Sequence, residues 1–358
     1  MKIIHCSDLH LDSKMERKLS LTKSSERRNE LLNNFQRLIS FAKENDVKAI
    51  LISGDLFDSN SARVSTKNVL KSEISANSEI TFFYVCGNHD DNFNIFEDDC
   101  PDNFIVFDDK LSSFKIGNIN ISGLNLTKDN INSFYENLVF SENYKNILML
   151  HGDVFSNAQS NLYIDLKKLK NKNIDYLALG HIHMSSMDKI DDRGVYCYPG
   201  CLEGRGFDEC GEKGFMLLEV EQTISYEFIK FAQREFIKKE IDVTNLYTIE
   251  DYKLNLENIF KNLNEKDFVR IIFIGTKDED CNGFANILEN FYKDKFYYFE
   301  IVDNSNVKFN ISKYMEEETS LKAEFLKLVF QDENLSEEDK NKIANVGLQA
   351  LKGDDIIL

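Results

Sequence analysis

The chain has 358 residues, of which 42% are hydrophobic and 29% are charged, a balance typical of a soluble globular protein and not of a disordered one. Its 43 Lys and Arg residues against 61 Asp and Glu residues give a net charge of −18. This charge excludes a protein that coats nucleic acid by bulk attraction, but not one that binds phosphate through metal ions. No apolar run approaches the roughly 20 residues of a membrane span or forms a secretory signal. The seven cysteines include no C-x-x-C pair, so we expect a cytoplasmic protein without a disulfide framework.

Short apolar runs that end in polar clusters recur through the first part of the sequence. Runs that stop at Gly or at a polar cluster are typical of buried strands. Polar clusters at the ends of such strands indicate a site built on loops at the tips of a sheet. The runs, in chain order, are Lys2–Cys6, Lys48–Ser53, Thr81–Cys86, Asn146–Leu150 and Tyr176–Leu179.

Helical patterns separate the first of these strands. Apolar residues at helical spacing from Leu31 to Ala42 predict one helix, and Val64–Ile74 is a weaker candidate for a second. From Asp108 to Leu124 the short apolar runs predict meandering strands. Strands that alternate with helices favour an α/β layer structure.

After about residue 220 the pattern becomes that of a small α+β segment. The predicted elements are an extended stretch at Ser225–Val243, helices at Ile249–Leu263 and Phe284–Tyr292, and strands at Phe268–Ile274 and Phe296–Val302. From about Lys313 the tail is predicted to be helical and acidic, with Ser336 as the cap of a last helix. The residues expected on the apolar faces of these two helices are Leu321, Phe325, Leu328 and Val329, then Ile343, Val346, Ala350 and Leu351.

The histidines carry most of the functional information. The chain has six, and all but His5 lie in polar clusters at the predicted strand ends. His5 lies inside the first strand, so we expect a structural role for it. A lone histidine is more often a surface or core residue with a satisfied partner, but this explanation is poor for five of them together. The clustered histidines are His10, His89, His151, His181 and His183.

The clusters supply a mixed nitrogen and oxygen donor set without a thiolate. Such a set suits Mn²⁺, Zn²⁺ or Fe²⁺ better than Mg²⁺ or Ca²⁺, which prefer oxygen ligands. Two divalent ions about 3.5–4 Å apart, with one shared carboxylate, can clamp a phosphoryl group for in-line displacement. In an extended loop His181 and His183 share a side, so their rings can straddle such a pair. The candidate donors are Asp8, His10, Asp55, Asn88, His151, His181 and His183.

These clusters, in this order, resemble those of the calcineurin-like metallophosphoesterases. The shared blocks are D-x-H, G-D, G-N-H-D, H-G and G-H-x-H, and the resemblance covers roughly residues 1–205. The stretches that start at Asp8 (DLHLDS), Gly54 (GDLFD) and Tyr198 (YPGCLEGRGF) are similar to bacterial DNA-repair exonucleases of the SbcD and YhaO type. The resemblance implies a four-layer α/β/β/α sandwich followed by a capping domain. We therefore expect a catalytic domain at 1–220, an α+β capping domain at 221–310 and a helical tail at 311–358.

The resemblance also implies a role for each donor. One metal would be held by Asp8, His10, Asp55 and His183, and the other by Asp55, Asn88, His151 and His181. Asp55 would bridge the two ions and so take part in catalysis. His89 would be no ligand and would act on the leaving oxygen as a catalytic acid. Asp58 stands where some relatives carry a histidine.

A basic segment follows the first cluster. The stretch from Lys14 to Arg28 holds six basic residues against two acidic ones, which favours a loop that touches nucleic-acid backbone. The alternatives are a solvated loop, or a pair of arginines that only pin the following helix against acids. Arg205 is a further candidate for a phosphate contact, with a structural ion pair as its alternative. The predicted nucleic-acid contacts are Lys14, Arg17, Lys18, Arg27, Arg28 and Arg205.

The function that these features favour is a Mn²⁺-dependent phosphodiesterase acting on DNA, with Fe²⁺ or Zn²⁺ as alternative metals. The resemblance implies a 3′→5′ exonuclease with possible single-strand endonuclease activity. It further implies a homodimer whose C-terminal helices dock on an SMC-like ATPase, although an apolar stripe more often packs within its own chain. One rival is a phosphatase or phosphodiesterase for small molecules or phosphoproteins, which suits the acidic charge. The other is a scaffold subunit of an ATPase complex with a vestigial site.

Overall fold

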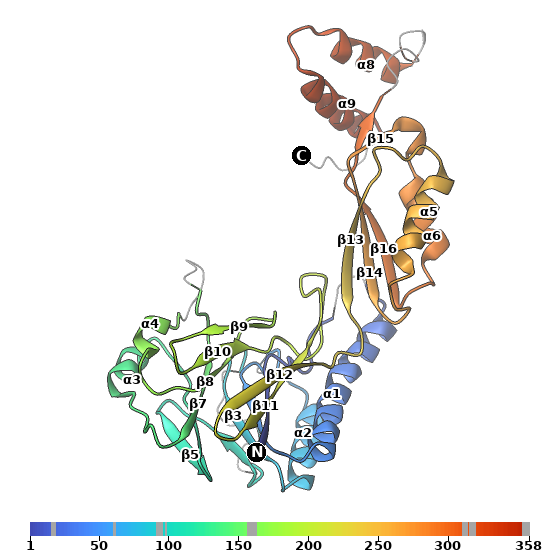
Figure 1. The fold of residues 1–358 in the computed structure, drawn as a ribbon. Helices are drawn as coiled ribbons and strands as arrows, with labels where there is room; N and C mark the ends of the chain where they lie inside the picture. Colours follow the sequence, from blue (N-terminus) through green and yellow to red (C-terminus); the bar gives the residue numbers. More distant parts are fainter. Residues whose placement is uncertain are drawn as a thin grey trace. The chain divides into compact units, whose positions relative to one another are not determined.

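The computed structural model describes residues 1–15, 19–59, 62–90, 96, 99–155, 163–309, 314 and 320–352. The chain divides into two compact units, Met1–Glu235 and Phe236–Leu358 (Figure 1). All the predicted metal donors belong to the first unit. Within the described ranges, no helix is both long and apolar enough to cross a membrane.

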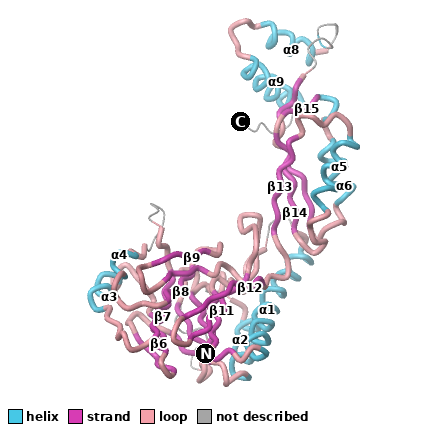
Figure 2. Tube along the Cα trace, in the orientation of Figure 1, coloured by secondary structure: helices cyan, strands magenta, loops and turns pink. Residues whose placement is uncertain are grey.

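The first unit contains two six-stranded sheets (Figure 2). The first sheet has four parallel neighbours extended by an antiparallel hairpin at one edge. In spatial order its strands are β12 (Ile224–Lys230), β11 (Gly214–Val220), β1 (Lys2–Cys6), β2 (Val47–Ser53), β3 (Thr81–Val85) and β4 (Phe104–Val106). The second sheet contains β5 (Ser112–Ile116), β6 (Ile119–Gly123), β7 (Lys145–His151), β8 (Tyr176–Gly180), β10 (Val195–Tyr198) and β9 (Ser186–Lys189).

Helices cover the outer face of each sheet, while the inner faces pack against each other. Side chains alternate between the two faces of a strand, so Ile3 packs between the sheets and Ile4 packs against helices. The first sheet is covered by α1 (Leu21–Glu44) and α2 (Val64–Ala76), and the second by α3 (Ile131–Asn137) and α4 (Leu166–Leu169). The expected four-layer α/β/β/α sandwich is therefore confirmed.

The first unit extends past residue 220, where we expected the catalytic domain to end. The reason is that β12 pairs with β11 along its whole length, from Gly214–Lys230 to Val220–Ile224. The extended stretch predicted at Ser225–Val243 is therefore two strands, one in each unit. The division of the rest of the chain at residue 310 stays a prediction.

The second unit begins with a three-stranded parallel sheet covered on one face by two helices. Of its elements, β14 and α6 have the bounds that the sequence predicts. The predicted helix 249–263 ends three residues earlier, the predicted strand 296–302 is shifted by one or two residues, and β15 and β17 were not predicted. The elements of this part of the unit are β13 (Phe236–Asp242), α5 (Ile249–Phe260), β14 (Phe268–Ile274), β15 (Thr276–Asp278), α6 (Phe284–Tyr292), β16 (Tyr298–Asp303) and β17 (Asn306–Lys308).

Two helices, α8 (Leu321–Gln331) and α9 (Glu337–Lys352), pack on each other at the end of the described chain. Ser336 caps α9, as predicted, because its hydroxyl accepts from the backbone N–H of Asp339 at 3.1 Å. The predicted apolar faces were largely wrong. Leu321 and Leu328 are 73% and 72% exposed. The residues buried on these helices are instead Ala323, Leu326, Val329, Ala344 and Leu348, of which only Val329 was predicted.

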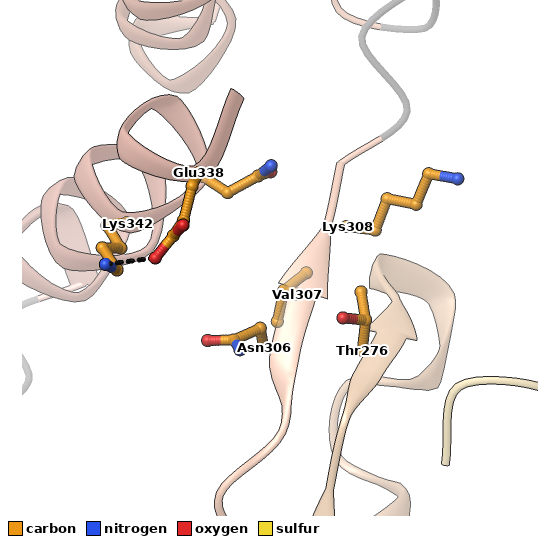
Figure 3. A pocket seen from close by; sticks show the side chains of 7 residues that line it. Thr276, Asn306, Val307, Lys308, Glu338 and Lys342 are labelled. Atoms are coloured by element: carbon orange, nitrogen blue, oxygen red, sulfur yellow. Dashed lines mark hydrogen bonds and ion pairs between the residues drawn. The ribbon is translucent and has the colours of Figure 1, made fainter. Parts of the chain in front are cut away.

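A surface hollow of about 350 Å³ lies in the second unit between β15, β17 and α9 (Figure 3). Its charged side chains include Lys308 and an ion pair of 2.6 Å between Lys342 and Glu338. The remaining lining residues are Thr276, Asn306, Val307 and Asn341. The lining offers one carboxylate and no histidine, so it does not resemble the donor set predicted from the sequence.

Candidate metal centre

The predicted donors come together because they follow parallel strands. The carboxyl ends of neighbouring parallel strands meet at one edge of a sheet, and the two sheets bring two such edges together. The seven donors are Asp8 and His10 after β1, Asp55 after β2, Asn88 after β3, His151 at the end of β7, and His181 and His183 after β8. Their spatial proximity is what the strand-end pattern predicted.

One half of the site is a pair of facing histidines. His10 Nε2 and His183 Nε2 lie 3.2 Å apart. The Nδ1 atom of His10 lies 3.2 Å from Asp58 Oδ1, and that of His183 lies 2.8 Å from Glu209 Oε1. Because an ionised carboxylate only accepts hydrogen bonds, Glu209 holds the ring proton of His183 on Nδ1, whereas Asp58 faces His10 Nδ1 by charge alone, without hydrogen-bond geometry. The Nε2 lone pair of His183 therefore faces His10 Nε2, an arrangement that fits a cation between the two rings.

The other half is built on Asn88. His151 Nδ1 lies 2.9 Å from the carbonyl oxygen of Ser53, which fixes its proton there. Its Nε2 lone pair then faces Asn88 Oδ1 at 3.0 Å, again two acceptors in contact. His181 Nδ1 lies 3.0 Å from the same oxygen. A second cation fits this arrangement.

Asp55 lies between the two halves. Its Oδ2 atom is 3.7 Å from His10 Nε2 and 3.7 Å from His151 Nε2. Its Oδ1 atom accepts the backbone N–H of His89 at 3.0 Å, which fixes the carboxylate plane. Asp8 offers a ligand atom within 4.8 Å of those of its neighbours in both halves. A carboxylate that lies between two groups of histidine nitrogens is suited to act as a ligand shared by two cations.

The site is buried and locally strained. Asp8, His10 and Asp55 are at most 2% exposed. Buried carboxylates are costly unless a cation compensates them. The same three residues have positive φ angles of 53°, 44° and 49°, which non-glycine residues adopt at a cost and most often at functional sites. Both features are those of a site whose geometry serves a ligand.

Gly54 lets the two sheets approach each other at the site. Its φ of 89° lies in the left-handed region, and a Cβ there would meet His151 Nδ1 at 2.1 Å. Any larger residue at this position would displace the imidazole or the Asp55 loop. The glycine before Asp55 in the sequence is therefore part of the site's construction.

Burial and neighbouring groups shift the pKa values of three site residues, raising that of His183 and lowering those of Glu209 and His181. Burial alone would lower the pKa of His183, but the hydrogen bond to Glu209 and the charge of Asp8 raise it overall. Burial would likewise raise the pKa of Glu209, but the contacts with His183 and Arg205 hold it well below the usual range. The pKa of His181 is lowered by burial and by the neighbouring His151. Glu209 is therefore a carboxylate in the folded chain.

His89 differs from the other clustered histidines. Its ring is exposed and lies 5.1 Å from the ring of His10, edge to face. Its Nδ1 atom lies 3.1 Å from the carbonyl oxygen of Asp58. If Nδ1 donates to that carbonyl, Nε2 remains for a substrate. His5 is instead buried, with its Nδ1 2.9 Å from the hydroxyl of Tyr176, in keeping with the expected structural role.

The sequence reasoning assigned no role to three acidic residues of the site. Glu209 is hydrogen-bonded to His183 Nδ1, and Asp58 lies 3.2 Å from His10 Nδ1. Asp90 accepts from the backbone N–H groups of Leu56 and Phe57 at 2.7 and 2.9 Å, and so fixes the Asp55 loop. Asp58 and Asp90 end the GDLFD and G-N-H-D motifs, so the signal was present. Glu209 had no motif to mark it.

The predicted nucleic-acid contacts fare differently. The prediction for Arg27 was wrong, because its side chain is fully buried and pairs with Glu203 at 3.0 Å. Lys14 is exposed and Arg28 is partly exposed. Arg205 forms ion pairs of 2.7 Å with both Asp58 and Glu209. Arg17 and Lys18 lie outside the described residues.

A helix-covered double sheet with this donor cluster at its strand ends defines a metal-dependent phosphoesterase. The chain belongs to the calcineurin-like phosphoesterase family, which it matches over residues 1–185. The family predicted from the motifs is therefore confirmed, and the protein is a metallophosphoesterase with a candidate dimetal site.

Individual relatives match a larger part of the chain. The uncharacterized metallophosphoesterase YhaO of Bacillus subtilis is 26% identical over 301 residues, which cover 78% of this chain and 73% of that protein. The DNA double-strand break repair protein Mre11 of Sulfolobus acidocaldarius is 26% identical over 297 residues, covering 77% and 75%. The Mre11 protein of Sulfurisphaera tokodaii is 27% identical over 288 residues, covering 74% and 69%.

Proposed function

We propose that this metallophosphoesterase is a DNA nuclease that uses two divalent ions, with Mn²⁺ as the native metal. The observation that carries the metal part is the close approach of His10 Nε2 to His183 Nε2 and of His151 Nε2 to Asn88 Oδ1. The choice of DNA is supported by the relatives that are named as double-strand break repair proteins. Exonuclease polarity from 3′ to 5′ and single-strand endonuclease activity extend the same proposal.

Each ion has its own set of ligands in this proposal. Asp8, His10, Asp55 and His183 would hold one ion, and Asp55, Asn88, His151 and His181 the other. The bound ions would polarise the phosphoryl group and lower the pKa of a bound water. Glu209 orients His183 through a hydrogen bond to its Nδ1 atom. His89 lies outside both sets and has Nε2 available for the leaving oxygen.

A nuclease assay tests the proposal directly. End-labelled single- and double-stranded DNA should be degraded with Mn²⁺, more slowly with Mg²⁺, and not at all after metal removal. Asp55→Asn serves as the matched inactive control, because its carboxylate serves both ions. Hydrolysis of p-nitrophenyl phosphate with no cleavage of DNA would instead assign a phosphatase. If the purified chain binds no metal, the nuclease proposal fails and the scaffold role in an ATPase complex is favoured instead.

Lys14 and Arg28 are the described residues that we propose contact the DNA backbone, together with Arg17 and Lys18. Phosphate contacts position a nucleic acid without reading its sequence, and each releases counterions. The double variant Lys14→Gln/Arg28→Gln should flatten the plot of log affinity against log salt by about 0.9 for each duplex phosphate that is no longer neutralised. Lys167→Gln/Lys170→Gln, two exposed lysines of another surface, is the matched control. An unchanged slope in the first variant would contradict the proposed role of these two residues.

The assembly part of the proposal concerns α8 and α9. Leu321 and Leu328 lie exposed on α8, and Ile343 and Leu351 are 39% and 45% exposed on α9. Exposed apolar side chains on paired helices suit docking of another helix. We propose that they bind the coiled coil of an SMC-like ATPase and that the chain forms a homodimer. Leu321→Gln/Leu328→Gln should abolish co-elution with that ATPase and leave hydrolysis of a small phosphodiester unchanged.

A further inference from the structure

Arg205 bridges two carboxylates beside the site. Its Nη1 atom donates to Asp58 Oδ1 at 2.7 Å, and its Nη2 atom donates to Glu209 Oε1 at 2.7 Å. Its backbone N–H also donates to Glu209 Oε2 at 2.8 Å. We call these three residues, Arg205, Asp58 and Glu209, the Arg205 clamp. The planar guanidinium fork is the side chain best suited to hold two carboxylates in a fixed geometry.

The clamp contacts both histidines of one half of the site. Asp58 Oδ1 lies 3.2 Å from His10 Nδ1, and Glu209 Oε1 lies 2.8 Å from His183 Nδ1. One arginine therefore sets the positions of two carboxylates. Glu209 orients the His183 imidazole by a hydrogen bond, and Asp58 acts on the His10 imidazole by its charge. The two Nε2 atoms converge to 3.2 Å at the far side of the rings. The approach of the two Nε2 atoms in this half of the site therefore depends on charged side chains, and each of these side chains can be tested by substitution.

The other half of the site is oriented differently. His151 is held by the backbone carbonyl of Ser53, and His181 Nδ1 faces the candidate ligand Asn88 itself. Neither of these contacts involves the clamp. The two halves should therefore respond differently to its removal, and this asymmetry makes the clamp testable one metal position at a time.

The loop that carries Arg205 is itself anchored in the core. Arg27 donates to the carbonyl of Gly204 at 2.8 Å and to Glu203 at 3.0 Å. The backbone N–H of Gln233 donates to Glu203 at 2.7 Å. Because these contacts hold the loop without Arg205, a substitution at Arg205 removes the clamp and leaves the backbone supported. The buried Arg27 thus serves the loop rather than DNA.

We propose that Arg205 is a positioning residue that sets the metal affinity of the His10/His183 position, and that it does not contact DNA. The inference rests on the proposed two-metal site. Without the guanidinium, two neighbouring carboxylates repel each other and release the imidazoles from their converging orientation. Partners that orient metal-ligating histidines in this way typically contribute about 10–100-fold in metal affinity.

Titration of the metal-free full chain with Mn²⁺, followed calorimetrically without substrate, tests the proposal. The unmodified chain should bind two ions. Arg205→Gln should weaken one ion by about 10–100-fold and leave the other unchanged. Glu209→Gln should weaken the same ion, whereas Arg205→Lys should give a partial loss because an ammonium cannot span both carboxylates. Arg193→Gln, which removes an ion pair of 2.9 Å with Asp175 before β8, is the matched control and should bind both ions normally.

The outcomes separate this inference from the proposed function. If the unmodified chain binds no Mn²⁺, the two-metal function itself fails. If it binds two ions and Arg205→Gln binds both with unchanged affinity, the positioning role fails. Equal weakening of both ions together with a lower Tm would also overturn it, because that is the signature of general destabilisation. If Arg205→Gln changed the slope of log DNA affinity against log salt at saturating Mn²⁺, Arg205 would be a DNA contact and the proposal would be wrong.

Discussion

At the level of single residues, we expect His89 to act in proton transfer and the donors around it to bind metal. His89 is exposed, and its Nδ1 faces the Asp58 carbonyl. His89→Ala should therefore retain both ions and lower kcat on DNA by about 10²–10⁴-fold, the usual contribution of a general acid or base. Steady-state kinetics and elemental analysis of the same sample measure the two quantities.

His10 provides the contrast for that experiment. Its ring lies 5.1 Å from that of His89, but its Nε2 faces His183. His10→Ala should lose metal as well as turnover. If the His89→Ala variant also lost a metal ion, or kept full kcat, the proposed role of His89 as a catalytic acid would be wrong.

The seven donors were predictable because their signal is local in the sequence. A His, Asp or Asn directly after a buried apolar run is visible without knowing the fold, and parallel strands bring such ends together. Glu209 and the burial of Arg27 were not predictable in this way. Arg27 is buried because Glu203, far along the chain, folds onto α1. A basic segment in sequence does not reveal which of its cations has such a partner.

Gly54 links the residue scale to that of the sheets. Gly54→Ala places a Cβ 2.1 Å from His151 Nδ1, so we expect a lower Tm and weaker Mn²⁺ binding. Gly117→Ala is the matched control, since Gly117 has a φ of 60° but no atom within 4 Å of the added Cβ. It should cost only the roughly 1–2 kcal/mol of left-handed backbone strain and retain both ions. Equal metal affinity in the two variants would contradict the proposed role of Gly54 in shaping the metal site.

At the level of elements, α1 is joined to the end of the first unit by ion pairs. Glu30 pairs with the buried Arg27 and accepts from Arg234 Nη2 at 2.7 Å. Burial alone would raise the pKa of Glu30, but Arg234 and Arg27 lower it overall below its ordinary value of 4.5. Because the folded pKa is the lower one, Glu30 stabilises the fold above about pH 4.5, and this contribution is lost as the pH falls through the folded value.

Glu30→Gln tests that contribution. Removing one partner of a buried ion pair costs about 3–5 kcal/mol, so the free energy of unfolding at pH 7 should fall by roughly that amount. The difference from the unmodified chain should shrink in denaturant titrations at progressively lower pH. Glu26→Gln is the matched control on the same helix, since Glu26 is half exposed and lies 3.6 Å from Arg234. It should cost at most about 1 kcal/mol. A pH-independent difference would rule out the ionised carboxylate as the cause.

The tail helices show where periodicity reaches its limit. Apolar residues of α8 lie on two adjacent stripes, one through Leu321 and Leu328 and one through Leu326 and Val329. Both stripes have helical spacing, so the sequence favours neither of them. Packing against α9 decides that the stripe through Leu326 and Val329 is the buried one. The sequence could therefore predict the helices and the Ser336 cap but not the buried face.

At the level of the whole molecule, chemistry and cores are divided between the two units. All six histidines precede residue 184, so the candidate metal centre needs nothing from the second unit. The apolar clusters on both sides of each sheet of the first unit are formed by its own residues, and the clusters around α5, α6, α8 and α9 belong to the second. Each unit therefore has the core that an independent fold requires.

A chain cut after Glu235 should fold and hydrolyse a small aryl phosphodiester at nearly the full rate, while its cleavage of DNA should fall strongly. The reason is that the second unit holds no histidine, so its contribution is expected in substrate binding. A cut after Val220 tests the boundary itself. It removes β12 from its pairing with β11, and it removes Arg234, the partner of Glu30. The shorter chain should therefore melt at a lower temperature than the chain cut after Glu235. Loss of both activities to the same extent in the longer chain would contradict a separate role for the second unit in DNA binding.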